Sequence, residues 1–220
     1  WEAVAPRVVS EVVKPEKKDA QGGTQGPVRL AEERPGILKI DGLAVFKQDK
    51  LVGWLNEKES LGLRLITGKD FKGYKIEESS ENDIKNILDF NVNEMEHKIK
   101  VQLDNGEPVI KVEVKIKADL RKYYLDRGPE FIAAEEISRV ENKLAESIRS
   151  DIEAALFKGQ KELKTDIFGF GFVFFRKFPN LWKEEYEARW PDLFPDIPVN
   201  IEVTAKVINS GTNIKKLIIK

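Results

Sequence analysis

The sequence predicts an α+β fold: a largely antiparallel β-sheet with a long amphipathic helix and shorter helices packed on it. Residues 98–117 alternate apolar and polar side chains on both sides of an Asn-Gly pair, which is typical of a β-hairpin with one buried face. Residues 137–156 repeat apolar side chains every three or four positions, which indicates an amphipathic helix. Residues 199–207 alternate again and predict another one-faced strand.

The composition is that of a folded domain with a strongly solvated surface, because 41% of the 220 residues are hydrophobic and 34% are charged. This length favours one main domain. The net charge of −1 gives no electrostatic reason to expect a nucleic-acid or acidic-membrane partner. The chain has no cysteine, which excludes disulfides and cysteine metal sites, and no stretch approaches the roughly 18 to 20 consecutive apolar residues of a membrane-spanning helix.

Residues 1–36 are predicted to be a connector from an upstream region, and residues 37–220 the α+β domain. The connector holds one candidate strand, in which Val8, Val9, Val12 and Val13 form an apolar patch whose partner we expect in a preceding domain; the alternative is a flexible tail. The chain starts at Trp1 without a secretory leader, so we expect a fragment whose targeting information lies upstream.

Residues 38–46 and 51–55 are rich in apolar and β-branched side chains, with Gln48 and Asp49 between them, which predicts two strands and a tight turn. A short helix is predicted at 57–67. Asn56 and Glu59 have the spacing of a capping box, and Gly68 stands where a helix C′ glycine belongs.

The hairpin around Asn105 and Gly106 follows from turn chemistry, because both central residues of a type I′ turn need a positive φ. With these two residues at the turn, the apolar side chains of both strands fall on one face, so the register is consistent with burial. The expected cross-strand pairs are Val101 with Ile110 and Ile99 with Val112.

A helix of about seven turns is predicted after this hairpin, and its one-sided apolar stripe should lie across the apolar face of the sheet. The stripe consists of Ile137, Val140, Leu144, Ile148, Ile152 and Leu156. Residues 165–195 are dense in aromatic side chains and contain Pro179, Pro191 and Pro195, which predicts two short helices broken at the prolines.

One candidate structural or interaction motif lies in the aromatic region and consists of Asp166, Phe168, Gly169, Gly171 and Trp182. Its Gly-Phe-Gly sequence lacks the further residues of a phosphate-binding loop. We expect Asp166 to be the N-cap of a helix whose glycines permit close packing. Most of the aromatic side chains should be core, and any exposed part would suit docking of a partner protein.

A second candidate is a basic face of the hairpin, formed by Lys98, Lys100, Lys111, Lys115 and Lys117. A solvated sheet face is the favoured interpretation, and contact with anionic lipid headgroups is the alternative. Single-stranded nucleic acid is not expected to bind there, because no aromatic side chains are interleaved with these lysines.

No catalytic, cofactor or metal site is predicted. His97, next to Glu94 and Glu96, is the single histidine and is expected at the start of a strand in solvent, since no second histidine or cysteine completes a typical zinc set. The carboxylate pairs Glu135–Glu136 and Glu184–Glu185 could serve glycosidase chemistry, but a solvated surface is favoured for them.

Three segments resemble the C-terminal domain of the Ger(x)C family, the lipoprotein C subunits of bacterial spore germinant receptors. They are residues 42–55 (GLAVFK and KLVGWL), 165–183 (TDIFGFG, RKFP and LWK) and 194–203 (FP and PVNIEV). The resemblance covers about residues 37–210 and departs from the family pattern after Gly171, where a more polar turn with a glutamate is usual.

The resemblance implies a β-sheet flanked by helices, in a parent protein held by an upstream lipid anchor at the outer face of the spore inner membrane. It further implies membrane-embedded A and B subunits as partners. We therefore expect a non-enzymatic domain without a cofactor, acting in receptor assembly or signal transmission. The alternatives are a surface carbohydrate- or peptidoglycan-directed enzyme, and a germinant sensor with a closed apolar pocket.

Overall fold

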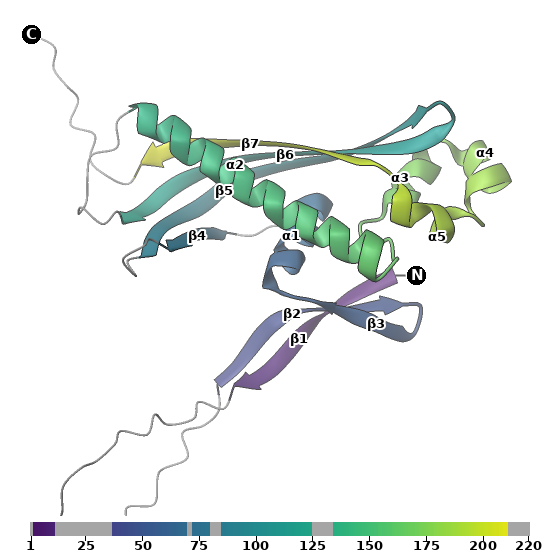
Figure 1. Cartoon of the computed structure of the whole chain (residues 1–220), viewed down its shortest axis with the longest axis horizontal. Helices are drawn as coiled ribbons and strands as arrows, with labels where there is room; N and C mark the ends of the chain where they lie inside the picture. Colours follow the sequence, from purple (N-terminus) through teal and green to yellow (C-terminus); the bar gives the residue numbers. More distant parts are fainter. Residues whose placement is uncertain (1, 12–36, 70–71, 80–84, 125–133, 211–220) are drawn as a thin grey trace, which may run out of the picture.

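The computed structural model describes residues 2–11, 37–69, 72–79, 85–124 and 134–210, which form two sheets and a set of helices (Figure 1). The first sheet has the order β1-β2-β3, and the second has the order β4-β5-β6-β7. The α+β prediction is confirmed. The strands are β1 (Glu2–Glu11), β2 (Ile37–Lys47), β3 (Lys50–Leu55), β4 (Gly73–Ser79), β5 (Lys85–Asp104), β6 (Glu107–Tyr124) and β7 (Val199–Ser210).

The small sheet contains the predicted hairpin of β2 and β3, closed by Gln48 and Asp49. Its third strand, β1, pairs antiparallel with β2 within the same chain, so the expectation of a partner in a preceding domain was wrong for Val8 and Val9. Val12 and Val13 lie outside the described residues. The domain boundary at residue 37 stays a prediction.

Helix α1 (Glu57–Thr67) follows β3 and has the predicted caps. Glu59 N donates to Asn56 Oδ1 at 2.9 Å, and Asn56 N donates to Glu59 Oε2 at 2.8 Å, which completes the capping box. Gly68 closes the other end in a left-handed conformation with φ 72°.

The large sheet is built on the long hairpin of β5 and β6. Asn105 and Gly106 have φ values of 50° and 87°, and the predicted pairs of Val101 with Ile110 and Ile99 with Val112 are confirmed. Strands β4, β5 and β6 pair antiparallel, whereas β7 joins β6 in parallel. The second sheet is therefore mixed rather than purely antiparallel.

Helix α2 (Ala134–Phe157) crosses the apolar face of the large sheet, as predicted (Figure 1). Val140, Leu144, Ile148 and Ile152 are buried and share one core with the apolar residues of β5 and β6. Burial of such a side chain stabilises the fold by very roughly 1.5 to 3 kcal/mol before chain entropy is subtracted.

The C-terminal helical region lies at the turn of the β5–β6 hairpin (Figure 1). Tyr186 Oη donates to Gly106 O at 2.5 Å, and Lys177 Nζ donates to Val101 O at 2.6 Å, so this region is tied to β5 and its turn. Its elements are the π-helix η1 (Lys158–Glu162), α3 (Phe170–Lys177), α4 (Pro179–Leu181), the π-helix η2 (Trp182–Tyr186), α5 (Trp190–Leu193) and the 3₁₀-helix η3 (Phe194–Asp196).

The prediction of two helices in this region was wrong in number, because residues 170–196 form five helical pieces. The prolines also act differently from the prediction. Pro179 is the first residue of α4, and Pro191 and Pro195 are the second residues of α5 and η3, where the missing N–H costs no helical hydrogen bond. Each proline therefore lies in the first turn of a new helical segment.

Candidate functional site

Asp166 organises the aromatic region through three hydrogen bonds that its carboxylate accepts. Oδ1 accepts from Phe170 N at 3.0 Å, and Oδ2 accepts from Gly171 N at 2.7 Å and from Trp190 Nε1 at 3.1 Å. The first two bonds serve the N-terminus of α3, and the third reaches across to α5. One side chain thus fixes two helices that are distant in sequence.

The predicted N-cap position was wrong. The N-cap residue of α3 is Gly169, with φ 77° and no side-chain cap of its own, and Asp166 lies three positions earlier. Asp166 still satisfies helical N–H groups, because the left-handed Gly169 turns the chain so that Phe170 N and Gly171 N point back to the carboxylate. Burial raises the pKa of Asp166, and the N–H donors act in the opposite direction.

Gly171 is required for close packing. A Cβ at this position would lie 2.8 Å from Trp190 Nε1 and 3.0 Å from Trp182 Cη2, so only glycine allows both indoles to rest on α3. The two indoles have ring centroids 5.2 Å apart. Phe168 is buried and stacks on Phe170 with ring centroids 5.1 Å apart.

All five residues of the predicted motif line one concavity of about 710 Å³, which we call the aromatic concavity. Phe172 lies at its opening with 63% of its surface exposed, and the Arg176 guanidinium carbon is 5.9 Å from the centre of the Phe172 ring. The other lining residues are Ile167, Phe175, Lys183, Glu187 and Trp190. Sequence reasoning placed these in an aromatic region, but not in a common site.

The chemistry of the concavity suits binding. Aromatic surface supplies contact area, and Lys183 and Glu187 supply one charge of each sign at its border. Both Asp166 oxygens accept N–H groups, which gives this carboxylate a structural role in the concavity.

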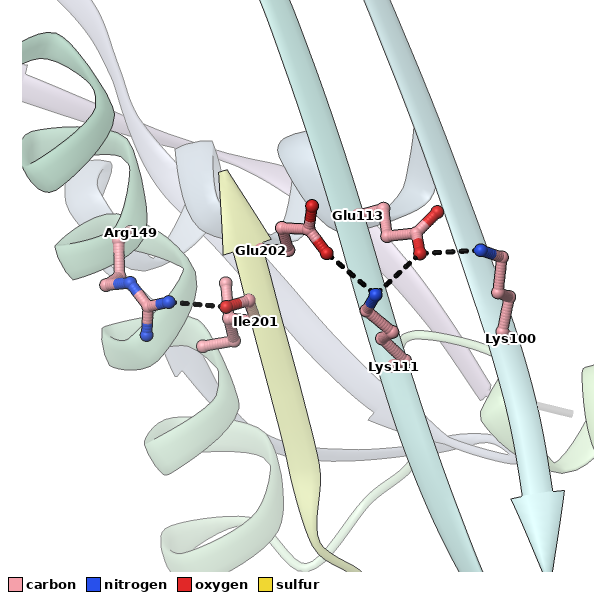
Figure 2. Close-up of polar contacts among 6 residues, drawn as sticks. All are labelled: Lys100, Lys111, Glu113, Arg149, Ile201 and Glu202. Carbon is pink, nitrogen blue, oxygen red and sulfur yellow. Dashed lines mark hydrogen bonds and ion pairs between the residues drawn. The ribbon is translucent and has the colours of Figure 1, made fainter. Parts of the chain in front are cut away.

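The predicted basic face is a mixed-charge face in the structure (Figure 2). Glu113 Oε1 lies 2.6 Å from Lys100 Nζ and 2.9 Å from Lys111 Nζ, and Lys111 Nζ also lies 2.7 Å from Glu202 Oε2 of β7. Lys117 pairs with Glu94 at 2.6 Å. These pairs offset the positive charge that contact with anionic lipid would require.

Glu113 lies at the centre of this face. Hydrogen bonds from Lys100 and then Lys111 lower the pKa of Glu113 to about 2. Lys98 and Lys115 are exposed and form no ion pair with the described residues. The ion pair of Glu202 with Lys111 could not be predicted from the sequence, because it depends on the parallel pairing of β7 with β6.

His97 lies within β5 rather than at the start of a strand, which corrects its predicted place. Its side chain packs over Gly68, where an added Cβ would lie 2.0 Å from His97 Cε1. Among the described residues, no group of three histidine, cysteine, aspartate or glutamate side chains could hold a metal ion.

No helix in the described part of the chain is both long and apolar enough to cross a membrane.

Comparison with known proteins places this architecture among spore germination proteins. Spore germination protein B3 of Bacillus subtilis (strain 168) is 25% identical over 197 residues, which cover 88% of this chain and 50% of the relative. Spore germination protein KC of the same organism is 26% identical over 185 residues, which cover 82% of this chain and 44% of the relative. The chain thus spans about half the length of the curated relatives it matches.

The crystal structure of the GerBC protein has the same fold, with a TM-score of 0.67 and 24% identity over 79% of this chain and 53% of that one. The family model described as "Spore germination B3/GerAC like, C-terminal" matches residues 41–211. This match includes the aromatic concavity and the mixed-charge face. The chain therefore belongs to the family of spore germination B3/GerAC-like C-terminal domains.

Proposed function

We propose that this chain is a non-catalytic domain of the C subunit of a spore nutrient germinant receptor and acts in receptor assembly or signal transmission. The proposed partners are the membrane-embedded A and B subunits, and the parent protein would be lipid-anchored at the outer face of the spore inner membrane. Support comes from the family match over residues 41–211 and from relatives named as spore germination proteins.

The observation that carries the proposal is the exposure of Phe172 at the aromatic concavity. A phenylalanine that is 63% exposed on helix α3 gains by covering its ring with a partner. The surface beneath it is already rigid, because Asp166 and Gly171 fix the two indoles. A rigid aromatic pocket with a charged border is typical of a hot spot in a protein interface.

A non-catalytic role is supported by the engagement of Asp166. The concavity holds two carboxylates, Asp166 and Glu187, as a carbohydrate-directed enzyme would require. Asp166, however, accepts three N–H bonds that hold the start of α3 and the indole of Trp190, whereas Glu187 is exposed. This arrangement favours a structural carboxylate.

The experiment compares Phe172→Asp with Phe157→Asp in the full-length subunit in spores. Phe157 is a matched control, since it is 60% exposed and lies at the end of α2 outside the concavity. Phe172→Asp should slow nutrient-triggered germination at least about tenfold or reduce the amounts of the A and B subunits, because a charge in an apolar contact costs several kcal/mol. Phe157→Asp should germinate as the wild type does.

Normal germination and normal subunit levels in Phe172→Asp spores would refute the proposal. A photo-crosslinking residue placed at position 172 should capture an A or B subunit in spores. The photo-crosslinking residue placed at position 157 should capture neither subunit.

A germinant sensor is the second candidate, favoured by the size of the concavity. Its volume of about 710 Å³ lies within the range of small-molecule sites, roughly 300 to 1,000 Å³. Nutrients that bind there would raise the unfolding temperature of the isolated chain, and Trp182→Ala would remove the shift. No shift with any nutrient that triggers the spores would exclude this candidate.

A further inference from the structure

The hairpin of β2 and β3 carries much of the exposed apolar surface. Leu51, Val52 and Trp54 have 49%, 36% and 42% of their surface exposed. Among the described residues, seven large hydrophobic side chains are exposed to at least this degree, and these three lie within the six residues of β3. Exposed apolar side chains that gather on one element mark a binding surface, whereas scattered ones need no explanation.

The strand register shows which face of the hairpin is turned outward. Val45 and Gly53 are cross-strand partners, and their face is turned to the core, since Val45 is fully buried. Trp54 follows Gly53, and Leu51 is paired with Phe46, the residue after Val45, so Leu51 and Trp54 both point to the opposite face. We call this opposite face the outer face of the hairpin.

Two lysines flank the turn of the hairpin. Lys47 and Lys50 are exposed cross-strand partners, and neither forms an ion pair with the described residues. Lys111 of the mixed-charge face, in contrast, lies between two carboxylates. Asp49 is the single acidic residue of the turn. The hairpin therefore has local positive charge beside its apolar surface.

This combination of side chains suits a membrane interface better than a protein interface. Leucine and tryptophan favour the boundary between lipid headgroups and acyl chains, and clustered lysines are attracted to anionic headgroups. Lysine also has a long apolar stem, so an ammonium group that starts on the other face can still reach the lipid phosphates. Protein interfaces, in contrast, are depleted in lysine.

The position of the hairpin agrees with a lipid partner. Figure 1 shows the turn between β2 and β3 at the same end of the molecule as α3 and the turn between β5 and β6. This end also carries the aromatic concavity, whose proposed partners are membrane-embedded subunits. A chain that contacts such subunits through the concavity has the hairpin close to the bilayer surface.

We propose that the outer face of the β2–β3 hairpin rests on an anionic lipid bilayer. Leu51 and Trp54 enter the boundary between headgroups and acyl chains with Val52 beside them, and Lys47 and Lys50 bind lipid phosphates. The inference rests on the proposed function for the membrane location of the parent protein. It gives this chain a direct lipid contact of its own.

The test is co-sedimentation of the full 220-residue chain with vesicles of phosphatidylglycerol and, separately, of phosphatidylcholine. The chain should bind the anionic vesicles at least about tenfold more tightly than the uncharged ones, because each lysine near an anionic surface contributes about fivefold. Leu51→Asp should weaken binding to phosphatidylglycerol at least about tenfold, since a carboxylate then replaces an apolar side chain in the boundary.

Ile208→Asp is the matched control. Ile208 is 50% exposed, and it lies two residues before the end of β7, which Figure 1 shows at the opposite end of the molecule. Vesicle binding of this variant should equal that of the wild type. Circular dichroism checks that both variants are folded.

A double variant, Lys47→Gln with Lys50→Gln, changes only exposed side chains and leaves the apolar face of the hairpin intact. It should lose affinity for phosphatidylglycerol by about fivefold for each lysine and bind phosphatidylcholine as the wild type does. An unchanged affinity of this variant for phosphatidylglycerol would overturn the proposal.

A fluorescent probe gives a second measurement. The chain has no cysteine, so Leu51→Cys and Ile208→Cys each accept one environment-sensitive dye. The emission of the dye at position 51 should shift to the blue on phosphatidylglycerol vesicles, and the emission at position 208 should not. Equal shifts at both positions would overturn the proposal.

Other occupants of the outer face predict other results. A wild-type chain that binds neither kind of vesicle would overturn the proposal, as would self-association in solution that Leu51→Asp abolishes, because the face would then belong to a second copy. Vesicle binding needs neither the A nor the B subunit. Failure of this test with a positive germination test refutes the lipid contact alone, and the reverse result refutes the role of the concavity alone.

Discussion

The Tyr74 hydroxyl donates a hydrogen bond of 2.5 Å to Asp151 Oδ2 and so joins β4 to α2. Ser147 Oγ lies 3.0 Å from the same hydroxyl. Both Tyr74 and Asp151 are buried, and burial raises the pKa of the Tyr74 hydroxyl well above its usual range. This polar pair fixes the short edge strand of the large sheet against its longest helix.

Tyr74→Phe should destabilise the chain by about 1 to 3 kcal/mol, because it leaves Asp151 buried with one donor fewer while the ring still fills its place. Urea unfolding at neutral pH measures this change. Tyr186→Phe is the comparison, since the hydroxyl of Tyr186 bonds a single backbone carbonyl and leaves no carboxylate unpaired. A smaller loss of unfolding free energy in Tyr74→Phe than in Tyr186→Phe would contradict a stabilising role of the hydrogen bond between Tyr74 and Asp151.

Asp151 should make stability depend on pH with an unusual sign. Burial raises the pKa of Asp151, while the bond from Tyr74 and the charge of Lys58 act in the opposite direction. A raised folded-state pKa means that the neutral carboxyl stabilises the fold fully below the unfolded pKa of about 3.9, and that this contribution is lost as pH rises through the folded value. The wild type should therefore lose stability relative to Asp151→Asn as pH rises from about 4 towards neutrality. A difference in unfolding free energy that is constant over this window would refute the prediction.

The contribution of Glu113 to stability should depend on pH with the opposite sign to that of Asp151. Its pKa is lowered from 4.5 to about 2 by Lys100 and then Lys111, so its charge stabilises the fold above the unfolded pKa and this contribution is lost as pH falls towards 2. The stability difference between the wild type and Glu113→Gln should shrink as pH falls from about 4.5 to 2, and high salt should reduce it at all pH values. NMR titration of the Glu113 carboxyl provides a direct check, and an ordinary midpoint near pH 4.5 would contradict the ion-pair geometry.

Local signals in the sequence predicted the elements whose determinants are close along the chain. The capping box of Asn56 and Glu59 and the turn at Asn105 and Gly106 each involve residues within three positions of one another, so their geometry follows from local chemistry. The apolar stripe of α2 could also be predicted from the sequence, because the helical repeat of apolar residues lies within a single element.

Long-range pairings could not be read in this way. The parallel placement of β7 on β6 joins segments separated by the whole of α2 and the aromatic region, and alternation alone does not state which strand is the neighbour. For the same reason, the sequence did not predict that the residues of the aromatic concavity come together. Asp166 was expected to be a helix N-cap but lies three positions before the N-cap of α3, and its bond to Trp190, which joins α3 to α5, crosses 24 positions.

Asp166→Asn should disrupt the aromatic concavity although the two side chains have almost the same size. Asparagine can offer its one carbonyl oxygen either to Phe170 N or to the pair of Gly171 N and Trp190 Nε1, and its NH₂ group then faces donors on the other side. We expect the free energy of unfolding, measured with urea, to fall by about 1.5 to 3 kcal/mol, as it does when a buried charged group loses a hydrogen bond. Asp192→Asn on α5 is the control, because Asp192 is exposed and should change stability by less than about 0.5 kcal/mol. Tryptophan emission should shift in Asp166→Asn alone, since Trp190 loses its carboxylate partner and Trp182 packs against it. Equal stability of the two variants would show that the carboxylate does not hold α3 and α5 together.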